Sequence, residues 1–218
     1  MRAYAMMAKL FGAAFLLNGV FAGLPAAAQS RAWDFEVLLN DAPIGYHRFT
    51  LREHGGQRQM KIEARFDVKV LVFNAYRYAH DASEDWRGNC LESLAARTSD
   101  NGEMFAVDAT REGERLAVTT ANGRAGFGGC IMSFAYWNPE ILRQSRLLNA
   151  QTGEYEAIKV TALADESIAV RGAAVMAKHY RITGPKNPID LWYSDDHEWL
   201  ALESTVAGGR RLRYRLRT

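Results

Sequence analysis

Apolar and polar residues alternate along most of the chain from Trp33 onward. The clearest example is residues 60–70, where every second side chain is apolar and those between are charged. The apolar set is Met60, Ile62, Ala64, Phe66, Val68 and Val70. Shorter stretches at residues 33–37 and 212–216 repeat the pattern. A period of two predicts strands with one buried and one solvated face, which is typical of an antiparallel sheet.

Turn-forming pairs separate these strands at hairpin spacing. They are Asn40-Asp41, Gly55-Gly56, Asn101-Gly102, Asn122-Gly123 and Gly208-Gly209. Asn-Gly favours the tight turns of hairpins because both residues tolerate positive φ. The spacing predicts roughly ten to twelve strands in one antiparallel meander. Neither a linker nor an internal repeat interrupts residues 29–218, so we expect a single domain there.

One segment after residue 28 has a helical pattern. Asn138 is a suitable N-cap, Pro139 suits the first helical position, and Ile141 and Leu142 begin an apolar face, which predicts a short helix over residues 139–148. One helix of this length cannot cover ten or more strands. The expected fold class is therefore all-β with one short helix, the sheet curving into a barrel or a half-barrel.

Residues 1–28 have the three parts of a secretory signal. Arg2 and Lys9 precede an apolar run, and Ala26-Ala27-Ala28 offers small residues for cleavage after Ala28. The run is short for a membrane span and is broken by Asn18 and Pro25, so we expect no transmembrane anchor after cleavage. The expected location is the periplasm of a bacterium, as a soluble exported protein.

Charge and cysteine content narrow the partners and the compartment. The 218 residues hold 27 basic and 25 acidic side chains, and residues 1–28 carry two of the basic ones and none of the acidic. The remainder is formally neutral, which gives no reason to expect nucleic acid as a partner. Cys90 and Cys130 form an even pair, which in an exported protein favours a disulfide over two free thiols.

The run CIMSFAYWNPEI begins at Cys130 and is unusually rich in apolar and aromatic residues. Read as a strand, it places Met132, Phe134 and Tyr136 on one face, and both faces are largely apolar. One interpretation is the wall of a pocket for an apolar ligand. Its ligand contacts would be Met132, Phe134, Tyr136, Trp137 and Ile141. The other interpretation is a strand covered on both sides and packed into the core.

Two stretches invite a catalytic or metal-binding interpretation. Residues 76–86 place Tyr76, Tyr78, His80, Glu84 and Trp86 on one face of a strand, a set suited to proton transfer or to a polar stripe bonded across strands. The segment SDDHEW, residues 194–199, lies between two apolar runs and favours a hairpin turn with Trp192 opposite Trp199. Its spacing fits neither zinc nor calcium ligation, so we expect no metal and no cofactor.

The C-terminal sequence RRLRYRLR places arginines at every second position. Such a row would either bind an anionic head group or form a solvated outer face paired with acidic residues such as Glu203. Sequence motifs of common hydrolases, metalloproteases and nucleotide-binding proteins are missing from the sequence, which leaves no positive argument for an enzyme.

Three further segments stand out: FDVKVLVFNAYRY (residues 66–78), SFAYWNPEIL (133–142) and PIDLWYSDDHEWLALEST (188–205). They resemble a family of exported bacterial proteins of unknown function. The resemblance covers nearly all of residues 29–218. It implies a signal peptide and a β-rich periplasmic domain, and no catalytic residues. The long meander also resembles the half-barrels of periplasmic lipid and lipoprotein carriers, a likeness of fold that does not fix function.

Three hypotheses follow for the function. The first is a periplasmic binding or carrier protein for an apolar or amphipathic small molecule. The second is a structural or partner-binding envelope protein whose concave side is filled core. The third is an envelope enzyme using His80 or His179 with nearby carboxylates. The first two differ in whether the run from Cys130 lines a cavity or fills it.

Overall fold

The computed structural model describes residues 29–70 and 73–217. The expected signal peptide lies outside these residues. The strands of the first half are β1 (Gln29–Leu39), β2 (Ala42–His54), β3 (Gln57–Val70), β4 (Phe73–Arg87), β5 (Cys90–Asp100), β6 (Glu103–Glu112), β7 (Arg115–Thr120) and β8 (Gly123–Gly128). Those of the second half are β9 (Arg146–Leu148), β10 (Tyr155–Ala157), β11 (Lys159–Ala162), β12 (Glu166–Val170), β13 (Ala173–Thr183), β14 (Ile189–Tyr193), β15 (Trp199–Val206) and β16 (Arg210–Leu216).

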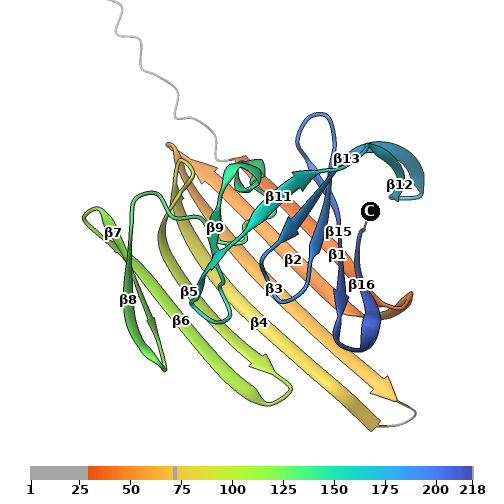
Figure 1. The fold of residues 1–218 in the computed structure, drawn as a ribbon, viewed down its shortest axis with the longest axis horizontal. Helices are drawn as coiled ribbons and strands as arrows, with labels where there is room; N and C mark the ends of the chain where they lie inside the picture. Colours follow the sequence, from red (N-terminus) through yellow and green to blue (C-terminus); the bar gives the residue numbers. More distant parts are fainter. Residues whose placement is uncertain (1–28, 71–72, 218) are drawn as a thin grey trace, which may run out of the picture.

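Fourteen of these strands form one antiparallel sheet, which confirms the predicted all-β class. The order along it is β11-β13-β14-β15-β16-β1-β2-β3-β4-β5-β6-β7-β8, and β12 pairs separately with β13. Pairing of β16 with β1, for example Leu216 with Phe35, joins the first and the last described strands in the middle of the sheet. The sheet does not close, because β8 and β11, at the two ends of this order, do not pair with each other (Figure 1). Of the two shapes considered, the open curved sheet is the one observed.

The strands are more numerous than the ten to twelve expected. The additional ones are short: β9 and β10 form a separate two-stranded sheet, and β11 and β12 both pair with β13. Segments of three to five residues carry too little alternation to be recognised from the sequence. The long strands follow the pattern, since Met60 and Ala64 in β3 are buried and Lys61 between them is exposed.

Residues 129–158, here called the covering segment, pack on the concave face of the sheet. The Ile131 carbonyl accepts a hydrogen bond from the Leu91 amide at 2.9 Å, and Trp137 meets Trp86 edge to face at 5.5 Å between ring centroids. In Figure 1 the helical turn and β9 of this segment lie across the long strands. A disulfide joins Cys90 to Cys130 with Cα atoms 4.8 Å apart, which confirms the predicted pair.

Two local predictions for the covering segment are wrong. Residues 130–137 are not a strand: only Ser133 makes an isolated bridge, to Leu148. The helix is a single 3₁₀ segment, η1 (Pro139–Arg143), although Asn138 caps it as expected by accepting from the Glu140 amide at 3.2 Å. The helix ends early because residues 146–148 pair with β10 and place Leu147 and Leu148 in the core. Tertiary burial here overrides the helical pattern.

The turn at SDDHEW is confirmed, but its register differs from the prediction. The Ser194 amide donates to the Glu198 carbonyl and His197 has a φ of 62°, so the segment is a tight turn. Trp199 lies opposite Tyr193 rather than Trp192, which pairs with Ala201. A bulge between Trp192 and Tyr193 shifts the register by one residue.

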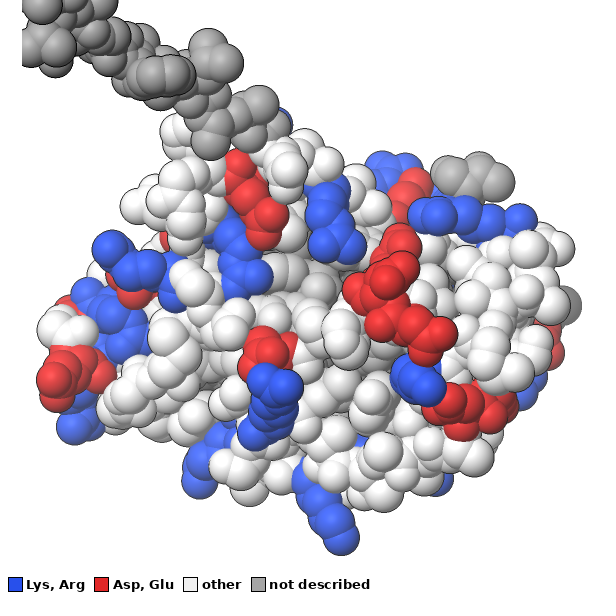
Figure 2. Space-filling view, turned by 90° about the horizontal axis from the view of Figure 1, so that it is seen from above, with Lys and Arg blue, Asp and Glu red and all other residues white. Residues whose placement is uncertain are grey.

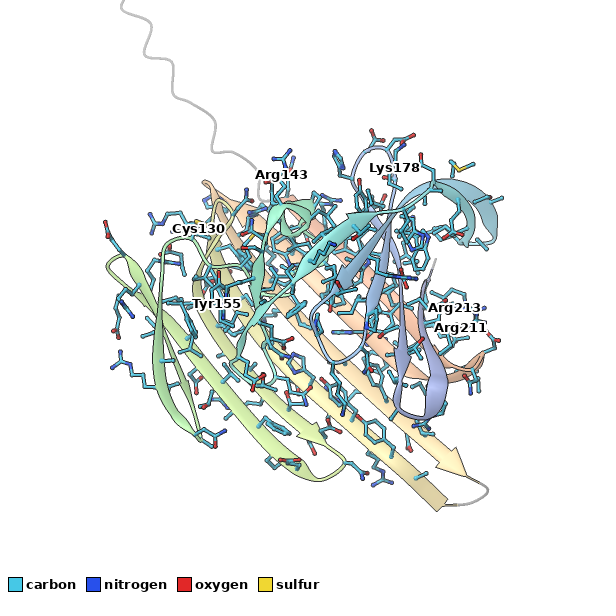
Figure 3. The ribbon with its side chains drawn as sticks, in the orientation of Figure 1. Cys130, Arg143, Tyr155, Lys178, Arg211 and Arg213 are labelled. Atoms are coloured by element: carbon cyan, nitrogen blue, oxygen red, sulfur yellow. A yellow bond between two sulfur atoms is a disulfide. The ribbon has the colours of Figure 1, made fainter. Side chains whose placement is uncertain are left out.

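The C-terminal arginines form a solvated face paired with acids. Arg213 lies 2.7 Å from Asp41 and 3.5 Å from Glu203, and Arg215 pairs with Glu36. Arg211 and Arg213 project from β16 in Figure 3. Across the face shown in Figure 2, basic and acidic side chains are interspersed. Among the described residues, no helix has the length and apolar character needed to cross a membrane.

Candidate functional site

A cavity of about 190 Å³, here called the inner cavity, lies between the concave face of the sheet and the covering segment. Strands β2, β3 and β4 contribute His47, Phe49, Ile62, Tyr78, His80 and Glu84 to its wall. The covering segment contributes Ser133, Phe134, Tyr136, Asn149, Ala150, Gln151 and Glu156, and Pro185 and Ile189 complete the wall. The alternation of the strands puts these residues on one face, and the covering segment walls part of that face into a cavity that is open to solvent.

The inner cavity continues into a wider space of about 760 Å³, here called the outer cleft. Tyr136, Asn149, Glu156, Pro185 and Ile189 border both spaces. Strands β15 and β16 add apolar side chains to the outer cleft, and β10 with its neighbours adds polar ones. The additional residues include Leu202, Leu212, Tyr214, Thr152, Glu154 and Lys186. The two spaces together form a groove with apolar and polar surfaces, of a size suited to a small ligand.

Two neutral histidines form part of the inner cavity. His80 is buried and its Nδ1 is 2.7 Å from the Thr98 hydroxyl, while His47 Nδ1 is 3.1 Å from the Tyr214 hydroxyl. Burial lowers the pKa of His47 to about 3 and that of His80 to about 4. Both imidazoles are therefore uncharged near neutral pH. They offer hydrogen bonds to a ligand without offering a positive charge.

Glu84 is a buried acidic residue of the inner cavity, and both of its carboxylate oxygens accept hydrogen bonds. Its side chain is 2 % exposed; Oε1 accepts from the Ser133 hydroxyl at 2.7 Å and Oε2 accepts from the Trp86 indole N–H at 3.0 Å. Burial raises the pKa of Glu84 to about 7, and the two hydrogen bonds act in the opposite direction. A carboxyl group of this kind exchanges a proton near neutral pH.

Tyrosines from the sheet and the covering segment surround the cavity. The Tyr78 hydroxyl donates to the Gln151 side chain at 3.0 Å, and the ring of Tyr78 stacks on Phe66 with centroids 5.1 Å apart. The Tyr193 hydroxyl donates to the Tyr136 carbonyl at 2.7 Å, which fixes the covering segment against β14. Burial raises the pKa of both Tyr78 and Tyr136, so each phenol keeps its proton.

The predicted ligand contacts divide into two groups. Phe134 and Tyr136 line the inner cavity, whereas Met132, Trp137 and Ile141 are packed in the core with exposures of 1 %, 5 % and 0 %. The covering segment is not an extended strand, and its turns direct Ser133 and Phe134 to the cavity together. The run from Cys130 therefore both fills the concave side and lines a space within it.

The structure brings three of the residues considered for proton transfer to one wall and places the others outside it. Tyr78, His80 and Glu84 line the inner cavity, and Trp86 is buried beside it. His179 is not part of that wall: it stacks on Trp192 with ring centroids 4.5 Å apart and its Nε2 is 2.9 Å from Asp190. Within residues 29–70 and 73–217, no group of three His, Cys, Asp or Glu side chains is arranged to hold a metal ion.

Sequence reasoning missed several residues of the site. His47 follows the alternation of β2 and faces inward, but a single histidine beside arginine and tyrosine gave no distinct signal. Ser133 and Glu84 are 49 positions apart, so only their contact in space pairs them. Asn149 and Gln151 lie in an irregular part of the covering segment, and Glu156 lies on β10, whose three residues are too few to show a periodic pattern.

The fold and the site define a class: an open, curved antiparallel sheet with a covering segment and a partly polar cavity. The sequence model of a family described as a domain of unknown function, DUF6134, matches residues 35–217. The chain belongs to this family. No curated protein matches the chain.

A solved structure supports the same fold. The chain is similar to a "Beta-barrel-like Protein of Domain of Unknown Function DUF1849 from Brucella abortus", with a TM-score of 0.60 and 10 % sequence identity. The match covers 88 % of this chain and 97 % of the other. At this identity the likeness concerns the fold alone.

Proposed function

We propose that the chain is an exported binding protein that holds a small amphipathic molecule on the concave face of its sheet. The observation that carries this proposal is the inner cavity and its continuation into the outer cleft, with Phe134 and Tyr136 on one wall and buried polar groups on the other. A fully packed core would leave no such space. A groove with both apolar walls and convergent polar groups is typical of ligand sites.

The dimensions of the two spaces suit a ligand with two parts. The inner cavity of about 190 Å³ accepts a compact polar group, because His47, His80 and Glu84 converge there. The outer cleft offers Leu202, Leu212 and Ile189 to an apolar part. Export is part of the proposal: residues 1–28 have the composition of a secretory signal, and the Cys90–Cys130 disulfide suits an oxidising compartment.

Native mass spectrometry of the protein purified from a bacterial periplasm tests the proposal. We expect a native mass above that of the chain, which falls on denaturation with release of a small amphipathic species. Phe134→Ala should reduce the ligand-bound fraction severalfold. Phe105→Ala is the matched control, because Phe105 is also partly buried but lies on β6 outside both spaces. A bare chain mass, with no binding of added amphiphiles, would favour a partner-binding envelope protein instead.

A further inference from the structure

The walls of the inner cavity are rich in aromatic rings. Phe49 and Tyr78 come from the sheet, and Phe134 and Tyr136 come from the covering segment with ring centroids 6.2 Å apart. The faces of aromatic rings carry partial negative charge and attract cations, most strongly where water is excluded. The ring surfaces therefore favour a positively charged group over a negatively charged one.

The charged groups of the same wall have one sign. Glu84 and Glu156 both line the inner cavity, and of the described residues no Lys or Arg does. Lys186 borders only the outer cleft. Glu156 lies close enough to Tyr136 that its charge adds to the effect of burial in raising the pKa of that phenol. An anionic group in the inner cavity would face two carboxyl groups and no cation to balance it.

A buried ring nitrogen without a hydrogen-bond partner belongs to a residue of the same wall. His47 lines the inner cavity, and its Nε2 is buried with no hydrogen-bond partner among the described residues. When Nδ1 of the neutral ring donates its proton to the Tyr214 hydroxyl at 3.1 Å, Nε2 is an acceptor. A buried acceptor of this kind is costly unless a donor reaches it. An ammonium group carries hydrogen-bond donors together with the positive charge that this wall favours.

We infer that the molecule held in the inner cavity carries a protonated amine, seated between the Phe134 and Tyr136 rings and the Glu84 and Glu156 carboxylates. This inference rests on the proposed function and names the chemical class of its ligand. The apolar part of a cationic amphiphile extends into the outer cleft along Ile189, Leu202 and Leu212.

Three probes with the same alkyl chain separate charge from apolar contact. Octylammonium, octyl glucoside and octyl sulfate are titrated by calorimetry into the protein purified from a bacterial periplasm, at pH 8 and below the concentrations at which they form micelles. An alkylamine is protonated at this pH, since its pKa is close to that of lysine. We expect the Kd of octylammonium to be at least tenfold lower than that of octyl glucoside, and octyl sulfate to bind more weakly than both.

The possible results distinguish the inference from the proposed function. If octyl glucoside or octyl sulfate binds as tightly as octylammonium, the inferred charge is wrong and the binding function stands. If none of the three binds, both are overturned.

A substitution at Glu156 tests the role of the carboxylates. Glu156→Gln retains an oxygen to accept from the Asn149 side chain, a bond of 2.7 Å in the wild type, and removes the charge. We expect about a tenfold loss of affinity for octylammonium and no change for octyl glucoside. Glu114→Gln, at an exposed turn outside the cavity, is the matched control and should change neither. An equal loss for both ligands, or no loss for octylammonium, would overturn the inference.

Discussion

The hydroxyl of Ser133 donates a hydrogen bond to the carboxylate of Glu84 at 2.7 Å, although the two residues lie 49 positions apart. Both side chains are buried, at 2 % exposure each. This contact joins the covering segment to β4 at the wall of the inner cavity. The Trp86 indole N–H donates to the other carboxylate oxygen of Glu84. The site therefore depends on a carboxyl group whose protonation changes near neutral pH.

The buried titratable groups predict how stability depends on pH. The folded-state pKa values of His47 and His80, about 3 and about 4, lie below their ordinary 6.5, so their contribution is lost as the pH falls below 6.5. The folded-state pKa of Glu84, about 7, lies above its ordinary 4.5, so its contribution is present at low pH and lost as the pH rises toward 7. Between pH 5 and 6 the two effects oppose each other.

Glu84→Gln removes the opposing effect. In the wild type, the titration of His47, His80 and Glu84 together should lower the free energy of unfolding by about 1.4 kcal/mol for each pH unit of acidification. In the variant only the two histidines titrate, so the loss should be about twice as large. Urea unfolding at pH 5 and pH 6 measures the difference. Glu114→Gln should keep the slope of the wild type. Equal slopes for wild type and Glu84→Gln would show that Glu84 is ionised throughout this range.

The Cys90–Cys130 disulfide should contribute strongly to stability. It closes a separation of 40 residues and ties the start of the covering segment to β5. Replacing both cysteines by serine should lower the free energy of unfolding by about 2–4 kcal/mol, since the unfolded chain then gains freedom. Chemical denaturation measures this, and reductant should destabilise the wild type but leave the double variant unchanged. An identical response of both proteins to reductant would contradict the prediction.

Gly45 should tolerate no side chain. Its φ is 153°, and a Cβ atom there would lie 1.8 Å from the Arg65 carbonyl oxygen of the adjacent β3. Gly45→Ala should therefore lower the melting temperature by several degrees, equivalent to at least about 2 kcal/mol, because backbone rather than side chain must move. Gly128→Ala is the control, since a Cβ there meets no atom within 4 Å and needs no positive φ. Equal melting temperatures for the two variants would contradict the prediction.

The long strands could be predicted from the sequence because the alternation within each one shows which of its side chains face the core. Alternation around Met60 predicted β3, and pairs such as Asn101-Gly102 predicted the turn between β5 and β6. The covering segment could not be predicted in this way. Its residues pack against β4 and β5 in irregular conformation, so neither a period of two nor a helical period describes them.

The sequence by itself determined an all-β antiparallel meander, favoured a disulfide between Cys90 and Cys130, and placed Tyr78, His80 and Glu84 on one face of a strand. These features follow from local alternation and composition, which act on neighbouring residues. Only the tertiary structure decided that the sheet stays open, that Met132 is core while Phe134 lines a cavity, and that Ser133 meets Glu84. These outcomes depend on how segments distant in the chain fill the concave side, and packing between distant segments leaves no periodic trace in the sequence.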